Sequence, residues 1–190
     1  MGHSANPMTL DQAIYVMDEF HDRKDFRMEV LCHLLLRCVR IGDCLKVIKI
    51  RSLYHANGSP RDRLLYRESK TGKDRNIPIE GSRFKAALAA YWPEAKSGYQ
   101  SGPAFLNRAR KSGLQSGGVK FLLAQFIGHR GIEQCSPYSF RKTGARTMWK
   151  NGSSIESVSH VLNHHSTRVT ETYIQITPKD VEDAMKCLAV

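Results

Sequence analysis

The chain has 190 residues, 41% of them hydrophobic and 25% charged, which is the composition of one globular domain able to bury a core. Lysine and arginine number 29 against 18 acidic residues, a formal net charge of +11 that favours a polyanionic partner such as nucleic acid. Charge alone leaves an ordinary basic protein equally open. No apolar run reaches the length of a membrane span and no signal-peptide pattern is evident, so neither a membrane-spanning nor a secreted protein is expected.

The N-terminal quarter of the chain predicts two helices and a strand. Residues 9–23 begin with Thr9 as a cap and carry apolar side chains three and four positions apart. The same spacing recurs over residues 28–41, so a second helix is expected to run up to Gly42. The next segment, CLKVIKI at 44–50, reads as a strand.

The middle of the chain predicts a hairpin, a helix and a loop. LLYRESKTGKDRNIPI at 64–79 reads as two strands joined by a two-residue turn, Thr71-Gly72. SRFKAALAAYW predicts a helix that stops at Pro93. Residues 96–118 are polar and rich in glycine and serine, with PAFLNR as their one candidate for a short strand, so a long loop is expected.

The C-terminal part of the chain predicts helices. Three are expected at 119–127, 137–150 and 154–162. A last helix opens with Thr177 as its cap and Pro178 at its first position. The apolar face of this helix is formed by Val181, Met185 and Leu188.

Together these elements predict the α+β class: a mainly α-helical domain with a small three-stranded antiparallel β-sheet. Residues 1–8 are a candidate tag or disordered leader, and residues 9–190 are expected to form the domain. The five cysteines are odd in number and include no C-x-x-C pair, so we expect reduced thiols in a cytoplasmic protein, with no metal and no cofactor.

The segment NHHSTRVTETYIQI, residues 163–176, raises the question of what its single tyrosine does. Taken alone, Tyr173 is expected to pack, because most tyrosines are structural. A tyrosine that attacks a phosphodiester needs guanidinium groups for the non-bridging oxygens and a proton donor for the leaving oxygen. It also needs cations near its phenol, whose ordinary pKa is about 10.

The chain offers one candidate for each of these requirements. Two arginines, a lysine beside the hairpin turn and a histidine nine positions before the tyrosine make up the set. Lys73 competes with the lysine for its role, and His165 competes with the histidine. In chain order the candidates are Arg40, Lys70, Arg141, His164 and Tyr173.

This order of residues resembles the catalytic domain of the tyrosine recombinases, the phage integrase family. RIGD at 40–43 resembles the first arginine box, R-[IV]-[SG]-E, and SKTGK at 69–73 resembles the hairpin lysine. YSFRKTGA at 138–145 is similar to H-x-L-R-H-[ST], and LNHHSTRVTETYI at 162–174 is similar to L-G-H-x-S-x-x-x-T-x-x-Y. Each box alone is a weak match, but all of them in order, over residues 9 to about 189, are specific.

The resemblance implies a site-specific DNA recombinase, or integrase, that needs no cofactor. Tyr173 would be the nucleophile and would form a 3′-phosphotyrosyl intermediate. Arg40, Arg141 and His164 would hold the phosphate, and Lys70 would be the general acid. Double-stranded DNA, a synaptic tetramer formed through the C-terminal helix and a nucleoid-associated location are also implied. The family's separate N-terminal DNA-gripping domain has no counterpart here, so either a catalytic fragment or a truncated protein is expected.

The spacing of the family boxes favours Lys70 over Lys73 and His164 over His165. The sequence also departs from the family pattern at three of the positions in these boxes. Tyr138 occupies the usual histidine position three before the second arginine; a neutral phenol there can donate a hydrogen bond to a phosphate. Asp43 replaces the usual glutamate, so its link to neighbouring groups is expected to be looser or water-mediated. Lys142 replaces a common histidine.

Two other functions use the same residues and stay open at the level of sequence. One is a type IB topoisomerase-like relaxer or a telomere resolvase. The other is a DNA-binding regulator that kept the fold but lost activity.

Overall fold

The computed structural model describes residues 5–107, 109 and 112–186 of the chain. Within them the fold is mainly helical, with one two-stranded antiparallel sheet. The elements in chain order are α1 (Leu10–Asp22), α2 (Phe26–Leu36), α3 (Ile41–Lys46), α4 (Ile50–Leu53), β1 (Arg63–Arg67), β2 (Asp74–Pro78), α5 (Ser82–Ala95), η1 (Lys96–Gly98), α6 (Ser116–Ala124), η2 (His129–Gly131), α7 (Pro137–Lys150), α8 (Ile155–Leu162), α9 (Thr167–Ile174) and α10 (Pro178–Lys186).

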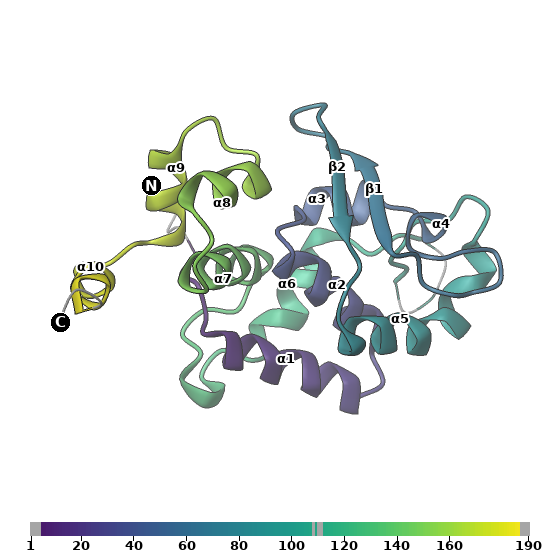
Figure 1. Cartoon of the computed structure of the whole chain (residues 1–190). Helices are drawn as coiled ribbons and strands as arrows, with labels where there is room; N and C mark the ends of the chain where they lie inside the picture. Colours follow the sequence, from purple (N-terminus) through teal and green to yellow (C-terminus); the bar gives the residue numbers. More distant parts are fainter. Residues whose placement is uncertain (1–4, 108, 110–111, 187–190) are drawn as a thin grey trace.

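Helix α2 is the centre of the fold, and α1, α5 and α7 pack against it (Figure 1). Every side chain from Arg27 to Leu35 is buried, so α2 is surrounded on all sides. Helix α1 begins behind Thr9 as predicted, with a reciprocal cap between Thr9 and Gln12. The large apolar core lies around α1, α2 and α5, and a smaller apolar cluster lies under α7, α8 and α9.

The predicted end of the second helix and the predicted strand at 44–50 are both wrong. Helix α2 ends at Leu36 because Cys38 adopts a left-handed conformation, with φ 64°, and the amide of Val39 donates to the carbonyl of Leu34 at 3.1 Å. The chain then starts α3, with Arg40 at its N-cap. Within 44–50, α3 ends at Lys46, Lys49 makes only an isolated bridge with Pro103, and α4 begins at Ile50. A short apolar run fits a buried helix as well as a strand, so its periodicity could not decide.

The described sheet therefore has two strands instead of the three expected. β1 and β2 pair antiparallel, with Arg67 opposite Asp74. The connection is the six-residue loop 68–73, which is longer than the predicted two-residue turn. The amide of Glu68 donates to the carbonyl of Lys73, and the amide of Gly72 donates to the carbonyl of Glu68, both at 2.9 Å. These two bonds close the loop and carry its tip towards α3.

Two boundaries near the long loop also differ from prediction. Helix α5 continues through Pro93 to Ala95; one proline removes a single helical bond, and the burial of Ala95 in the core holds the last turn. PAFLNR is not a strand over its described residues: Pro103 and Leu106 make only isolated bridges, and Arg108 lies outside the described residues. Helix α6 begins three positions before its predicted start, 116 against 119.

The C-terminal helices follow the predictions closely. Helix α7 spans 137–150 as predicted, and α8 begins one residue after its predicted start. Helix α10 opens at Pro178, and the amide of Asp180 donates to the hydroxyl of Thr177 at 3.2 Å. Figure 1 shows α10 standing apart from the other helices. Its Val181 and Met185 are exposed, and the predicted third apolar residue, Leu188, lies outside the described residues.

The described part of the predicted leader packs against α7. The amide of Met8 donates to the hydroxyl of Thr143 at 2.8 Å, and that hydroxyl donates to the carbonyl of Met8 at 3.1 Å. The side chain of Met8 is buried. Over the described ranges, no helix is both long enough and apolar enough to cross a membrane.

Candidate active site

A cleft of about 740 Å³ lies between α3 and the hairpin loop on one side and α7, α8 and α9 on the other. The structure brings every predicted site residue to its walls, although they come from five separate parts of the chain. These residues are Arg40, Asp43, Lys70, Lys73, Tyr138, Arg141, His164, His165 and Tyr173.

The C-terminal end of α8 gathers the two arginines. Nη2 of Arg141 donates to the carbonyl of Leu162 at 3.0 Å, and Nη2 of Arg40 lies 3.5 Å from the same oxygen. Nη2 of Arg75 donates to the neighbouring carbonyl of Val161 at 2.6 Å. The last carbonyls of a helix have no partner within the helix and carry partial negative charge, so they attract guanidinium groups.

Arg141 is fixed more firmly than Arg40. Its Nε donates to the carbonyl of Cys38 at 2.9 Å, and its side chain is buried in the base of the cleft. The left-handed turn at Cys38 therefore both ends α2 and positions this arginine. Arg40, at the N-cap of α3, is half-buried and forms an ion pair with the buried carboxylate of Glu68.

Asp43 is bound directly, so the expected looser or water-mediated link is wrong. Its Oδ1 accepts from the amide of Ser69 at 3.0 Å and from the hydroxyl of Ser69 at 2.6 Å. The hydroxyl of Ser69 makes up for the shorter aspartate side chain. This contact attaches α3 to the hairpin loop one residue before Lys70.

Tyr173 lies edge-on to His164, with ring centroids 5.1 Å apart. Its hydroxyl is buried and makes no hydrogen bond of good geometry with a described residue, although the guanidinium of Arg141 is close enough to act on it. Burial raises the pKa of Tyr173, and the guanidinium of Arg141 opposes this rise. The phenol is therefore protonated at neutral pH in the protein without DNA.

His164 is held in its neutral form. Burial, together with the charges of Arg141 and Arg40, lowers its pKa to about 4. Its Nδ1 lies 2.9 Å from the hydroxyl of Thr170, which is fully buried. When Thr170 donates to Nδ1, the Nε2–H of the ring is left as a hydrogen-bond donor.

The two lysine candidates both lie on the exposed loop and both line the cleft. Lys70 is among the cations that lower the pKa of His164. Tyr138 is half exposed, at 51%, and is near enough to raise the pKa of Tyr173. His165 is exposed at the rim.

Sequence reasoning missed several residues that support this site. Lys142 is only 3% exposed and its Nζ lies 5.1 Å from the centroid of the Tyr173 ring, so it is not a solvated helix residue. Burial lowers the pKa of Lys142. Glu68 and Asn163 were also missed, and their contacts join the hairpin loop to α8. Lys142, Asn163 and Thr170 lie within the family boxes, whereas no box includes Glu68.

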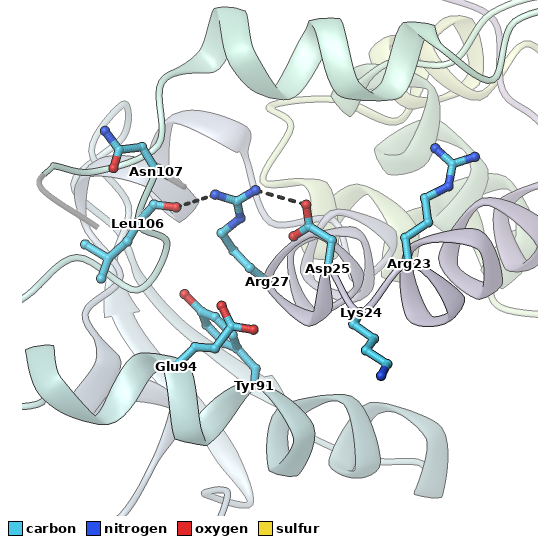
Figure 2. Close-up of a pocket in the computed structure, with 8 residues that line it drawn as sticks. All are labelled: Arg23, Lys24, Asp25, Arg27, Tyr91, Glu94, Leu106 and Asn107. Carbon is cyan, nitrogen blue, oxygen red and sulfur yellow. Dashed lines mark hydrogen bonds and ion pairs between the residues drawn. The ribbon is translucent and has the colours of Figure 1, made fainter. Parts of the chain in front are cut away.

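A separate pocket of about 250 Å³ contains none of the predicted residues (Figure 2). In it, Arg27 donates to the carbonyl of Leu106 at 2.6 Å and to the carboxylate of Asp25 at 3.0 Å. The bond to Leu106 attaches α2 to the connection between η1 and α6, which is a structural role. Over the described residues, no group of three or more histidine, cysteine, aspartate or glutamate side chains could hold a metal ion.

The fold is shared with a solved recombinase. The crystal structure of XerA recombinase superimposes with a TM-score of 0.76 and 21% sequence identity, over 98% of this chain and 66% of that chain. The domain thus has the fold of the tyrosine recombinase catalytic domains, and the α+β prediction is confirmed apart from the strand count.

Sequence comparison identifies the family. The sequence pattern of the phage integrase family matches residues 7–180, and this chain belongs to that family. Tyrosine recombinase XerC of Pelobacter propionicus is 24% identical over 173 residues, covering 90% of this chain and 55% of that protein. Tyrosine recombinase XerC of Anoxybacillus flavithermus is 26% identical over 183 residues, covering 92% of this chain and 58% of that protein. The chain thus spans little more than half the length of these relatives.

Proposed function

We propose that this domain cleaves and rejoins DNA strands in site-specific recombination, through a 3′-phosphotyrosyl intermediate on Tyr173. The observation that carries the proposal is the convergence of two guanidinium groups, a lysine, a neutral imidazole and a phenol in one cleft. A phosphodiester under attack by a phenol needs these groups, and nothing else in the reaction demands a cofactor.

The two arginines and His164 hold the scissile phosphate. Arg141 uses Nε and one Nη2 hydrogen on main-chain carbonyls, which leaves its Nη1 group for a non-bridging phosphate oxygen. Arg40 reaches the phosphate from the opposite wall, and the Nε2–H of His164 adds a neutral donor. Preorganised donors of this kind stabilise the charge that develops on the phosphate.

The chemistry then follows from the protonation states. The oxygen of Tyr173 forms a bond to phosphorus as its proton passes to solvent water in the cleft, and Arg141 stabilises the developing phenolate. The bond from phosphorus to the 5′-oxygen breaks, and Lys70 gives that oxygen a proton. The covalent bond conserves the energy of the phosphodiester, so a 5′-hydroxyl from either strand can reverse the step without ATP.

The partner that fits this cleft is double-stranded DNA, because the net charge of +11 favours a polyanion. Assembly of a synaptic tetramer through α10 is part of the proposal, and the exposed Val181 and Met185 supply an apolar face for it. A cytoplasmic, nucleoid-associated location follows from DNA as the substrate.

Covalent trapping tests the proposed function. We expect a pool of duplexes with randomised sequence, each nicked so that a short 5′-hydroxyl fragment can diffuse away, to yield protein–DNA complexes that survive denaturation. Trypsin should leave the nucleotide on the peptide 169–179, in which Tyr173 is the one tyrosine. Mass spectrometry reads out the attachment. DNA binding without any covalent product would instead support an inactive regulator, and attachment to another residue would refute the assigned nucleophile.

Strand exchange separates recombination from its rival. Two labelled duplexes that carry the trapped sequence should exchange strands when they are incubated together. Relaxation of supercoiled DNA without exchange between two sites would indicate a topoisomerase-like enzyme.

Tyr138 gives a prediction at the position where the family usually has histidine. We expect Tyr138→His to keep the cleavage rate within about threefold, and Tyr138→Phe to lower it about tenfold, the contribution of one charge-assisted hydrogen bond. The initial rate of covalent complex formation measures this effect. Equal rates for the wild type and both variants would show that the Tyr138 hydroxyl has no role.

A further inference from the structure

Glu68 is a fully buried carboxylate next to the site, at the end of β1, with 1% of its surface exposed. Its Oε1 pairs with Nη1 of Arg40. Its Oε2 accepts from the hydroxyl of Thr71 at 2.6 Å and from the side-chain amide of Asn163 at 2.6 Å. These partners come from the start of α3, the hairpin loop and the end of α8.

Asn163 makes this network a particular property of the chain. It is the C-cap of α8, with φ 59° and ψ 44°, and it directly precedes His164. The family box L-G-H has glycine at this position, and both glycine and asparagine tolerate the left-handed conformation. Only asparagine has an amide that can reach Glu68 and also donate to the hydroxyl of Thr71, at 2.9 Å.

The loop that carries Lys70 is therefore anchored on both sides of that residue. Ser69 is bound to Asp43 through its amide and its hydroxyl. Thr71 is bound to Glu68 and Asn163. The main chain at Lys70 has little freedom to move, while its side chain stays exposed beside the cleft.

Among the described residues the polar groups around Glu68 are donors, and Nη1 of Arg75 on β2 also lies 3.8 Å from its Oε1, so the site suits a carboxylate. Burial acts to raise the pKa of Glu68, but the hydrogen bonds from Thr71, Arg40 and Asn163 prevail and hold that pKa below its usual value. A glutamine of the same shape would offer one acceptor oxygen and turn an NH₂ group towards donors.

We propose that Glu68, with Asn163, is the positioning residue for the proton donor: it fixes the loop 68–73 against α3 and α8 so that the ammonium of Lys70 meets the departing 5′-oxygen. This inference rests on the proposed strand-cleavage function. Glu68 itself does not touch DNA and acts through Thr71 and the loop. A displacement of about 1 Å at a reacting group can slow a reaction about a hundredfold.

A substrate that needs no proton donor tests this role. In a duplex whose scissile phosphate carries a bridging 5′-sulfur, the leaving group departs as a stable thiolate, and protonation by lysine becomes unnecessary. We expect Glu68→Gln to slow covalent complex formation about ten- to a hundredfold on the ordinary duplex. On the sulfur duplex the same variant should react within about threefold of the wild type.

Two further variants sharpen the comparison. Asn163→Gly keeps the left-handed backbone and removes only the amide, so it should show a smaller loss on the ordinary duplex and the same rescue by sulfur. Lys70→Ala should be rescued in the same way, because it removes the proton donor itself. Glu29→Gln is the matched control, since Glu29 is a buried glutamate that is bound to His21 at 2.9 Å outside the cleft. It should react like the wild type on both duplexes.

The possible outcomes distinguish failure of the positioning role of Glu68 from failure of the proposed strand-cleavage function. Equal losses for Glu68→Gln on both duplexes would mean that Glu68 acts on Arg40 or on folding, and would overturn this inference alone. No loss on the ordinary duplex would also overturn it. Failure of the wild type to form covalent DNA on either duplex would refute the proposed function and this inference together.

Discussion

Replacement of Tyr173 by phenylalanine is expected to abolish covalent complex formation, with a loss of roughly 10⁴-fold or more, as for removal of a catalytic nucleophile. The structure adds a second expectation, which concerns stability. The hydroxyl of Tyr173 is buried and makes no hydrogen bond of good geometry with a described residue, Arg141 being its nearest donor group. Removing this hydroxyl removes a buried polar group that lacks a good hydrogen bond. The free energy of unfolding of Tyr173→Phe should therefore equal that of the wild type or exceed it by up to about 1 kcal/mol.

Urea unfolding and covalent trapping of the same samples measure both effects. Tyr54→Phe is the matched control, because the hydroxyl of Tyr54 is buried but donates to the carbonyl of Leu88 at 3.0 Å. That variant should lose about 1 kcal/mol of stability and keep its cleavage rate. If Tyr173→Phe lost as much stability as Tyr54→Phe, the Tyr173 hydroxyl would have a structural partner.

Gly144→Ala should lower the free energy of unfolding by about 3 kcal/mol or more. The same change at an unobstructed position inside a helix usually raises it by about 1 kcal/mol. Gly144 lies on α7 where that helix crosses α2, and a Cβ there would stand 1.7 Å from the carbonyl oxygen of Leu36. The obstacle is main chain at the end of α2, so no side-chain rotation can relieve it. Helix α7 would have to move away from α2, and Arg141 would move with it.

Urea unfolding also measures this effect, and Gly117→Ala is its control. Gly117 is in α6, and a Cβ there would meet no atom within 4 Å. We expect that variant to be neutral or to gain up to about 1 kcal/mol. Equal stabilities for the two variants would mean that α2 and α7 can separate at little cost. That result would contradict the close crossing on which the position of Arg141 depends.

The sequence predicted the members of the site better than their surroundings. Arg40, Arg141, His164 and Tyr173 could be found because the chemistry demands these residue types, and the resemblance to the phage integrase boxes supplies their order along the chain. The local structure at Arg40 could not, because the end of α2 depends on a left-handed conformation at Cys38, a residue that rarely adopts it. The apolar run after Arg40 suited either kind of element, so its pattern could not identify the helical turns there.

The contacts that support the site were hidden for a different reason. Asn163 and Glu68 are 95 positions apart, and no periodicity links them. The direct bond between Asp43 and Ser69 was unexpected because the length of the Asp43 side chain does not show that Ser69 lies within reach of it. Lys142 stands at a common histidine position of the family, but only the packing of α9 onto α7 shows that it lies over the ring of Tyr173.

The two guanidinium groups meet at a main-chain atom, the carbonyl oxygen of Leu162. A side-chain substitution within α8 cannot remove that main-chain oxygen. The exposed residues of this helix can therefore change type while the two arginines keep their spacing. Insertions and deletions are different, because they rotate the helix end and carry the oxygen elsewhere. We therefore expect α8 to tolerate exchanges of residue type at its exposed positions far better than any change in its length.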